Sequence, residues 1–370
     1  MTSSKINSIE AVMLVLSVMV SHTILSLPRD LLVLTKSSTI INLIYIAVIT
    51  VLISYLIYKL LKSFPGADIL DVSEFLGGKL FKNIVGTIFI THFIVSSSIL
   101  LRNFCETLKI VYYPITNIIP IILLFIITMC IANRFSFNAT LKTNTLILPF
   151  VFISIIFLSF ANINKFIPQC IFPILGDGIF NTFVLGLTNI YTFNGIALLY
   201  FLPPILKKPE QTKKIYIISI IVSAVYLIFC VAILLFMFSF FIDTNEISPL
   251  YNATRYIEIG NFFQRFESLF LLVWILAFAC YLSIVSKFSM RIFQKITNIE
   301  NPNSLIDIFG LLIFAISIIP KNYTISENFQ TLIYPILVIG ITFFMGIIIL
   351  ILANIQKYKQ NRLRKEKSNA

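Results

Sequence analysis

Two otherwise apolar segments of the chain contain polar interruptions whose residue types could bind a small ligand. The first segment contains Ser21-His22-Thr23 and is followed by Pro28; the sixth contains Thr192-Phe193-Asn194-Gly195 and is followed by Pro203-Pro204. A helix broken in an apolar environment leaves N–H and C=O groups unpaired, at several kcal/mol each, unless protein, water or ligand satisfies them. Freed N–H groups suit a carboxylate, and freed carbonyls suit an ammonium group or a cation. We therefore predict a ligand site lined by Ser21, His22, Thr23, Thr192, Phe193, Asn194 and Gly195.

An alternative explanation treats both segments as continuous helices. Serine and threonine can bond to carbonyls of their own helix, and Gly195 can serve as a packing notch. Each interruption, however, lies in the first segment of a five-segment half of the chain. Paired interruptions at corresponding positions of two halves are typical of the binding site of secondary transporters. This coincidence favours a binding site.

The sequence gives no support for catalysis or metal binding. Its two histidines, His22 and His92, both lie within apolar segments, and no neighbouring Asp, Glu or Cys completes a metal site. The G-x-S-x-G, H-E-x-x-H and P-loop patterns are absent. An ionisable residue at this depth points to a function, and the alternative is a neutral imidazole bonded to a carbonyl or hydroxyl. We expect neither an enzyme nor a bound metal or cofactor.

Long apolar helices must position these residues. Of the 370 residues, 58% are hydrophobic and only 12% are charged, which excludes an ordinary soluble domain. A bilayer core about 30 Å thick needs about 20 residues per helix, so ten helices fit the chain. We predict a single all-α integral membrane domain, 1–370, with inverted five-helix repeats at 9–160 and 179–355 and discontinuous first and sixth helices. The predicted helices are 9–27, 39–61, 80–101, 118–132, 143–160, 179–202, 215–242, 268–286, 305–319 and 331–355.

The basic residues predict the orientation of these helices. The formal net charge of +12 comes from 28 Lys and Arg against 16 Asp and Glu. Placing the loops on alternate sides puts 20 of the 28 on one side, and cytoplasmic loops collect Lys and Arg. Both termini are therefore predicted to be cytoplasmic. The basic tail, 356–370, could bind nucleic acid, but a Lys/Arg cluster beside a membrane helix is typical of contact with anionic lipid. We expect the lipid bilayer, and not nucleic acid, as its partner.

Several strings occur in a characteristic order along the chain. They are Lys5-Ile6-Asn7-Ser8-Ile9-Glu10, Leu25-Ser26-Leu27-Pro28, Ser63-Phe64-Pro65, Glu74-Phe75-Leu76-Gly77, Leu101-Arg102-Asn103-Phe104-Cys105-Glu106, and Arg265-Phe266-Glu267-Ser268-Leu269-Phe270 leading to Trp274. In this order the chain resembles the B subunits of spore nutrient germinant receptors. These proteins form the GerAB/GerKB-type spore germination family, within the amino acid–polyamine–organocation transporter superfamily. The resemblance runs essentially from end to end.

The resemblance implies a LeuT-like fold in the inner spore membrane, A-type and C-type partner subunits, and a small nutrient ligand such as an amino acid. The ligand would lie between the first and sixth helices, with His92 and Ser96 of the third helix and Cys280 and Ser283 of the eighth as further candidates. Ser21-His22-Thr23 departs from the family, whose members commonly carry glycine at the first break.

Three functions stay open. The chain could sense the nutrient to trigger germination, transport it as an amino-acid permease with real turnover, or serve only as an assembly subunit. Arg265 and Glu267 are interpreted as structure on the extracellular side, either a gate pair or a loop anchor.

Overall fold

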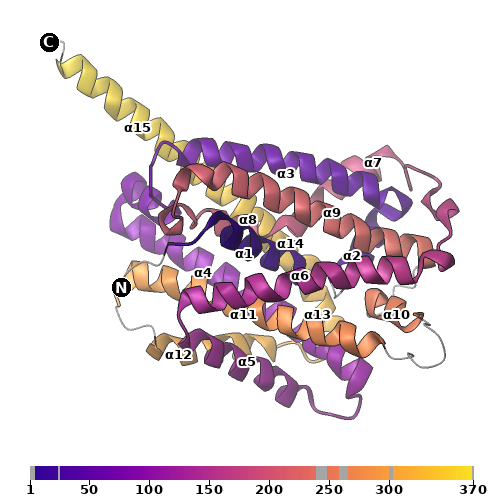
Figure 1. Cartoon of the computed structure of the whole chain (residues 1–370). Coiled ribbons are helices and arrows are strands. Elements are labelled where there is room, and N and C mark those ends of the chain that lie inside the picture. The colour runs from indigo at the N-terminus through magenta and orange to yellow at the C-terminus, as the bar shows by residue number, and fades with distance from the viewer. Residues whose placement is uncertain (1–4, 24–25, 239–247, 258–265, 300–302, 369–370) are drawn as a thin grey trace.

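Apolar side chains dominate the long segments of the chain, and in the computed structural model these segments form a bundle of helices (Figure 1). The structure describes residues 5–23, 26–238, 248–257, 266–299 and 303–368. Within these residues the only strand-like pairing is an isolated bridge between Ile6 and Leu206. The all-helical class predicted from the sequence is thus confirmed.

The helices follow one another with short connections. The first half contains α1 (Ser8–Val20), α2 (Leu27–Thr35), η1 (Lys36–Ser38), α3 (Thr39–Leu61), α4 (Ile69–Tyr112), α5 (Ile118–Arg134), α6 (Phe137–Ala161), η2 (Ile163–Lys165) and η3 (Pro168–Ile171). The second half contains α7 (Ile179–Phe183), η4 (Leu185–Phe193), α8 (Ile196–Leu199), η5 (Pro203–Ile205), η6 (Pro209–Gln211), α9 (Thr212–Phe238), α10 (Pro249–Arg255), α11 (Phe266–Thr297), α12 (Asn303–Ser317), α13 (Tyr323–Asn328), η7 (Phe329–Ile333), α14 (Tyr334–Leu337), η8 (Val338–Met345) and α15 (Gly346–Ser368).

Within the described residues, six helical stretches are long and apolar enough to cross a membrane, and four shorter apolar helices accompany them. The six are Leu27–Leu61, Ile69–Tyr112, Phe137–Ala161, Pro209–Phe238, Phe266–Thr297 and Tyr323–Arg364. Their outward faces carry large apolar side chains such as Leu52, Ile153 and Leu272, each more than half exposed. Such faces are typical of helices surrounded by lipid rather than water.

Several helices extend beyond their predicted ends. The third predicted helix, 80–101, is part of α4, whose 44 residues include a kink at Gly77 and Gly78, where Gly78 has a φ of 72°. The eighth, 268–286, continues in α11 to Thr297. Charged residues were read as helix ends in both places, although charges are tolerated on helical turns near the end of a bundle.

Hydrogen bonds hold several separate chain segments together at one end of the bundle. At the end that we call the terminal end, Ile6 bonds to Ile205 (N to O, 2.8 Å), Ile69 bonds to Tyr200 (N to O, 3.1 Å), and Lys357 bonds to the carbonyl of Ser63. These contacts place the start of the chain, the 62–68 loop, the segment after α8 and the later turns of α15 together. α7 and α10 lie at the other end of the bundle, which we call the opposite end (Figure 1).

Candidate ligand-binding site

The first predicted interruption is a turn between two helices. α1 ends at Val20, Ser21–Thr23 form the turn, and α2 begins at Leu27 with Pro28 in its first turn, where a missing N–H costs nothing. The hydroxyl of Ser21 donates to the carbonyl of Ser17, and that of Thr23 donates to the carbonyl of Val20 (2.6 Å). The hydroxyls therefore bond to their own helix, as the alternative explanation expected, but that helix is not continuous.

The second interruption lies in a segment that is not a regular α-helix. η4 is a 3₁₀ helix that ends at Phe193, Asn194 and Gly195 form a turn, and α8 begins at Ile196. The prediction of one interrupted helix over 179–202 is correct for the position of the break. It did not anticipate the tighter 3₁₀ winding, which often marks a functional hinge or strain.

The two interruptions pack against each other through Gly195. A β-carbon built on Gly195 would lie 2.7 Å from Cγ of Met19 and 2.8 Å from the carbonyl oxygen of Val15. Only a glycine lets the start of α8 approach the last turns of α1 so closely. Gly195 is therefore a packing notch, and the notch joins the two candidate segments.

Polar atoms without partners gather beside this contact. The imidazole ring of His22 lies edge-on to the ring of Tyr334, with centroids 5.9 Å apart, and the Tyr334 hydroxyl accepts a hydrogen bond from the side-chain amide of Asn194. Within the described residues, four buried atoms here have no partner with regular hydrogen-bond geometry: Nδ1 and Nε2 of His22, Oγ1 of Thr192 and Oδ1 of Asn194. The backbone of Val18 is also within reach of the His22 imidazole, although not in regular hydrogen-bond geometry. Buried polar groups normally have partners, so this cluster has unused donors and acceptors.

The eleven predicted site residues are all buried, and four of them lie on α4 and α11 rather than on the interrupted segments. His92 and Ser96 face each other on α4, with Oγ and Nδ1 3.5 Å apart, and the hydroxyl of Ser283 on α11 bonds to its own helix at Ala279 (2.8 Å). Among the hydrogen bonds, ion pairs and ring contacts of the described residues, none joins His92, Ser96, Cys280 or Ser283 to the interruptions. Such contacts do link residues of the two interruptions, and the four other residues stay predicted members of the site.

A family model described as "Spore germination protein" (Spore_permease) matches residues 5–324. The chain belongs to this spore germination family. It is similar to Spore germination protein YndE of Bacillus subtilis (strain 168), with 24% identity over 326 residues that cover 86% of this chain and 88% of that protein. It is also similar to Spore germination protein A2 of the same organism, with 26% identity over 344 residues that cover 87% of this chain and 88% of that protein. The family and the apolar helices together indicate a multi-pass membrane protein.

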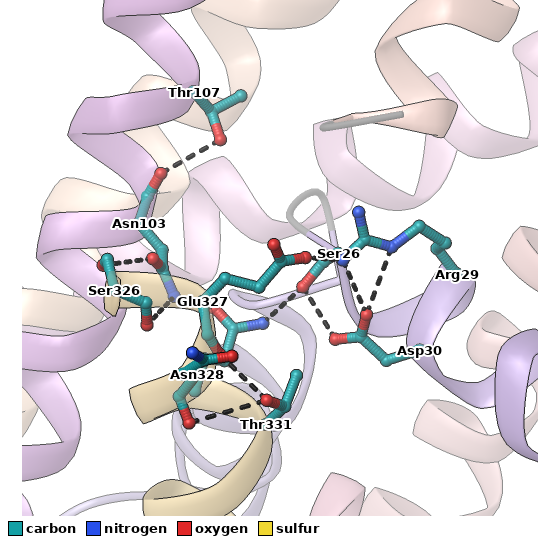
Figure 2. Close-up of polar contacts among 10 residues, drawn as sticks. Ser26, Arg29, Asp30, Asn103, Thr107, Ser326, Glu327, Asn328 and Thr331 are labelled. Atoms are coloured by element: carbon teal, nitrogen blue, oxygen red, sulfur yellow. Dashed lines mark hydrogen bonds and ion pairs between the residues drawn. The ribbon is translucent and has the colours of Figure 1, made fainter. Parts of the chain in front are cut away.

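A charged network that the sequence did not predict lies beside the first interruption. Figure 2 shows Ser26, Arg29 and Asp30 of the α2 segment facing Glu327 of α13. The Arg29 guanidinium pairs with Asp30 (Nη2 to Oδ1, 3.0 Å) and with Glu327, and its side chain is only 4% exposed. The first helix was predicted to end at 27, which left Arg29 in a loop. Instead α2 continues to Thr35, because each of these charges has a partner.

The network continues through hydrogen bonds to α4. The amide of Gln330 donates to the hydroxyl of Ser26 (2.6 Å), and Asn103 donates to the side-chain oxygen of Gln330 (2.5 Å). Ser326 in turn donates to Asn103 (Figure 2). Three separate segments, α2, α4 and α13–η7, are thereby fastened together next to the first interruption, on its opposite-end side.

Arg265, which the sequence suggested as part of a gate pair or a loop anchor with Glu267, lies outside the described residues.

Proposed function

We propose that the chain is the transporter-like membrane subunit of a spore nutrient germinant receptor and that it binds a small nutrient, an amino acid, between the two interruptions. The observation that carries the proposal is the group of four buried polar atoms on His22, Thr192 and Asn194 that have no regular hydrogen bond within the described residues. An amino acid brings an ammonium donor and carboxylate acceptors, which match the acceptor and donor capacity of an amide oxygen, a hydroxyl and a neutral imidazole. The subunit acts by binding rather than by catalysis.

The rest of the proposal concerns the surroundings of the site. Ten helices in two inverted five-helix repeats would place both interruptions near the middle of the inner spore membrane. The terminal end would face the cytoplasm, since 20 of the 28 basic residues belong to its side. An A-type and a C-type subunit would complete the receptor. Binding would shift a conformational equilibrium in the bundle to start germination.

The test replaces Asn194 with leucine in spores that carry no other copy of the chain. Release of dipicolinic acid is followed while each of the twenty amino acids is supplied singly, and membrane abundance is measured by immunoblot. We expect Asn194→Leu to abolish the response or to raise the half-effective concentration about tenfold or more, because a lost hydrogen bond to a charged group costs about 1.5–3 kcal/mol.

Asn83→Leu serves as the matched control, because Asn83 is exposed on α4. It should leave the response unchanged. An unaltered response in Asn194→Leu spores with normal abundance would refute nutrient binding at the interruptions and would leave an assembly role.

A second candidate function is an amino-acid permease with real turnover. The observation that favours it is the asymmetry of the bundle: the Arg29–Glu327 network fastens the opposite-end side of the first interruption, while a cavity of about 720 Å³ opens at the terminal end. Alternating access requires a state that is closed on one side of the membrane and open on the other. Sustained counterflow of a labelled amino acid in liposomes would establish turnover, and binding without counterflow would favour the receptor.

A further inference from the structure

A cavity of about 720 Å³ lies at the terminal end of the bundle, and none of the eleven predicted site residues lines it. Its walls come from five places: the start of α4, the turn between α5 and α6, the segment after α8, the last turns of α11 and the start of α12. The volume is in the range of small-molecule sites, about 300–1,000 Å³. The cavity is therefore large enough to hold a ligand of its own.

Basic side chains dominate the charges of this cavity. Lys287, Arg291 and Lys295 follow one another at four-residue spacing on α11, which places them on one face of that helix. Arg134 adds a fourth cation, and the only carboxylate in the lining is Asp68. The lining thus attracts anions.

Most of these cations already have partners. Lys295 pairs with Asp68 and Asp71, at 2.7 Å each. Lys287 donates to the carbonyl of Phe135 (2.8 Å) and to the hydroxyl of Thr140 (2.5 Å), which anchors the turn between α5 and α6. Arg134 pairs with Asp307 (3.6 Å) near solvent.

Arg291 differs from the other three. Its guanidinium stacks on the ring of Phe137, with Cζ 3.6 Å from the ring centroid, and across the residues that the structure describes it makes neither a hydrogen bond nor an ion pair. Stacking engages the flat face of the guanidinium and leaves its five N–H donors, which lie in the plane, without acceptors. A partly buried cation in a cavity whose N–H donors have no acceptors can bind an anion there.

We infer that this cavity binds a small oxyanion, a carboxylate or a phosphate, through the guanidinium edge of Arg291. Both anions present pairs of oxygens that match the guanidinium fork, and Lys287 adds positive charge from the next turn of α11. Asn133 also lines the cavity, and its buried Oδ1 has no partner within the described part of the chain, so it can accept from an N–H or O–H of the same ligand. The anion comes either from the aqueous phase or from the headgroup of an anionic lipid. This second site is independent of nutrient binding at the interruptions.

The test uses the full chain in nanodiscs of zwitterionic phosphatidylcholine. Sodium phosphate and sodium glutamate are titrated at constant ionic strength by isothermal titration calorimetry. We expect the wild type to bind at least one of these anions and Arg291→Gln to raise its Kd about tenfold or more, because charge-assisted bonds are roughly twice as strong as neutral ones. Arg291→Lys keeps the charge without the fork and should give an intermediate Kd, which also provides a reading if the glutamine variant fails to fold.

Lys208→Gln is the matched control, because it removes an exposed cation from a loop at the same end. It should bind as the wild type does. Repeating the wild-type titration in nanodiscs that contain phosphatidylglycerol separates the two sources: competition by the lipid indicates a headgroup, and an unchanged Kd indicates a free anion. The same Kd for Arg291→Gln and the wild type, or no wild-type binding of either anion in either nanodisc, would overturn the inference.

Discussion

Gly195 offers a direct test of the contact between the two interruptions, through the substitution Gly195→Ala. Its φ of −57° is one that alanine adopts readily, so backbone strain contributes nothing and any cost comes from contacts. The added β-carbon would lie 2.8 Å from the Val15 carbonyl oxygen, whereas ordinary van der Waals contact begins at 3.4 Å. Cγ of Met19, at 2.7 Å, is not the far end of that side chain, and the carbonyl belongs to the backbone of α1, so neither can move aside easily. The interruptions must therefore separate by about 0.6 Å.

The expected magnitude follows from this overpacking. Forcing an extra methyl group into a well-packed interior costs about 1–3 kcal/mol. The assay is the apparent unfolding midpoint of the full chain in detergent, at one fixed scan rate because membrane proteins often unfold irreversibly. Gly195→Ala should lower the midpoint by several degrees and reduce the germination response, since the four unpartnered atoms would no longer face one ligand.

Gly340→Ala is the matched control. Gly340 also lies in a membrane-spanning helical stretch, but nothing lies within 4 Å of a β-carbon built there. Alanine should be neutral at this position or should stabilise the helix by a few tenths of a kcal/mol to about 1 kcal/mol. Equal midpoints and equal responses for the two variants would show that the close approach of α1 and α8 does not exist in the protein.

Two further predictions concern the polar interior. Arg29→Ala removes the buried cation of the network and leaves the partly buried carboxylates of Asp30 and Glu327 without it, so the unfolding midpoint should fall by the equivalent of about 3 kcal/mol. Arg362→Ala, at an exposed pair, should cost less than about 1 kcal/mol in the same measurement. Similar losses for the two variants would contradict a network built around a buried cation. Thr192→Val keeps the shape and removes a buried hydroxyl that has no partner in the described part of the chain. The midpoint should therefore stay level or rise, while the half-effective nutrient concentration increases. A lowered midpoint would mean that this hydroxyl has a structural partner.

The interruptions could be predicted from sequence because their signal is local. A polar triplet inside an apolar run conflicts with a lipid-facing helix, and a proline downstream adds a second conflict. Both conflicts can be read within about ten residues, and the structure ends helices at Val20 and at Phe193. The 3₁₀ winding of η4 could not be read in the same way, because its apolar composition suits an α-helix equally well.

The charged network was missed because its signal is not local. Arg29 and Asp30 follow Pro28 directly, and charges without partners are rarely found in an apolar helix. A loop is therefore the prediction that these residue types favour. In the fold Arg29 pairs with Glu327, which lies 298 residues further along the chain. One sequence does not reveal that pairing, so the residues after 27 were predicted to form a loop, whereas α2 runs to Thr35.

The cations of α11 have environments that the sequence alone does not predict. Their four-residue spacing is visible in the sequence, and the helix that carries them was nevertheless ended at 286 because Lys287 looked like the start of a loop. Identical spacing leads to three different environments: Lys287 bonds to a hydroxyl and backbone carbonyls, Lys295 bonds to two carboxylates, and Arg291 stacks on an aromatic ring. Which cation keeps free donors depends on how α11 packs against the α5–α6 turn and the start of α4. Only the folded chain determines that packing, and for that reason an oxyanion site at Arg291 follows from the structure and not from the spacing.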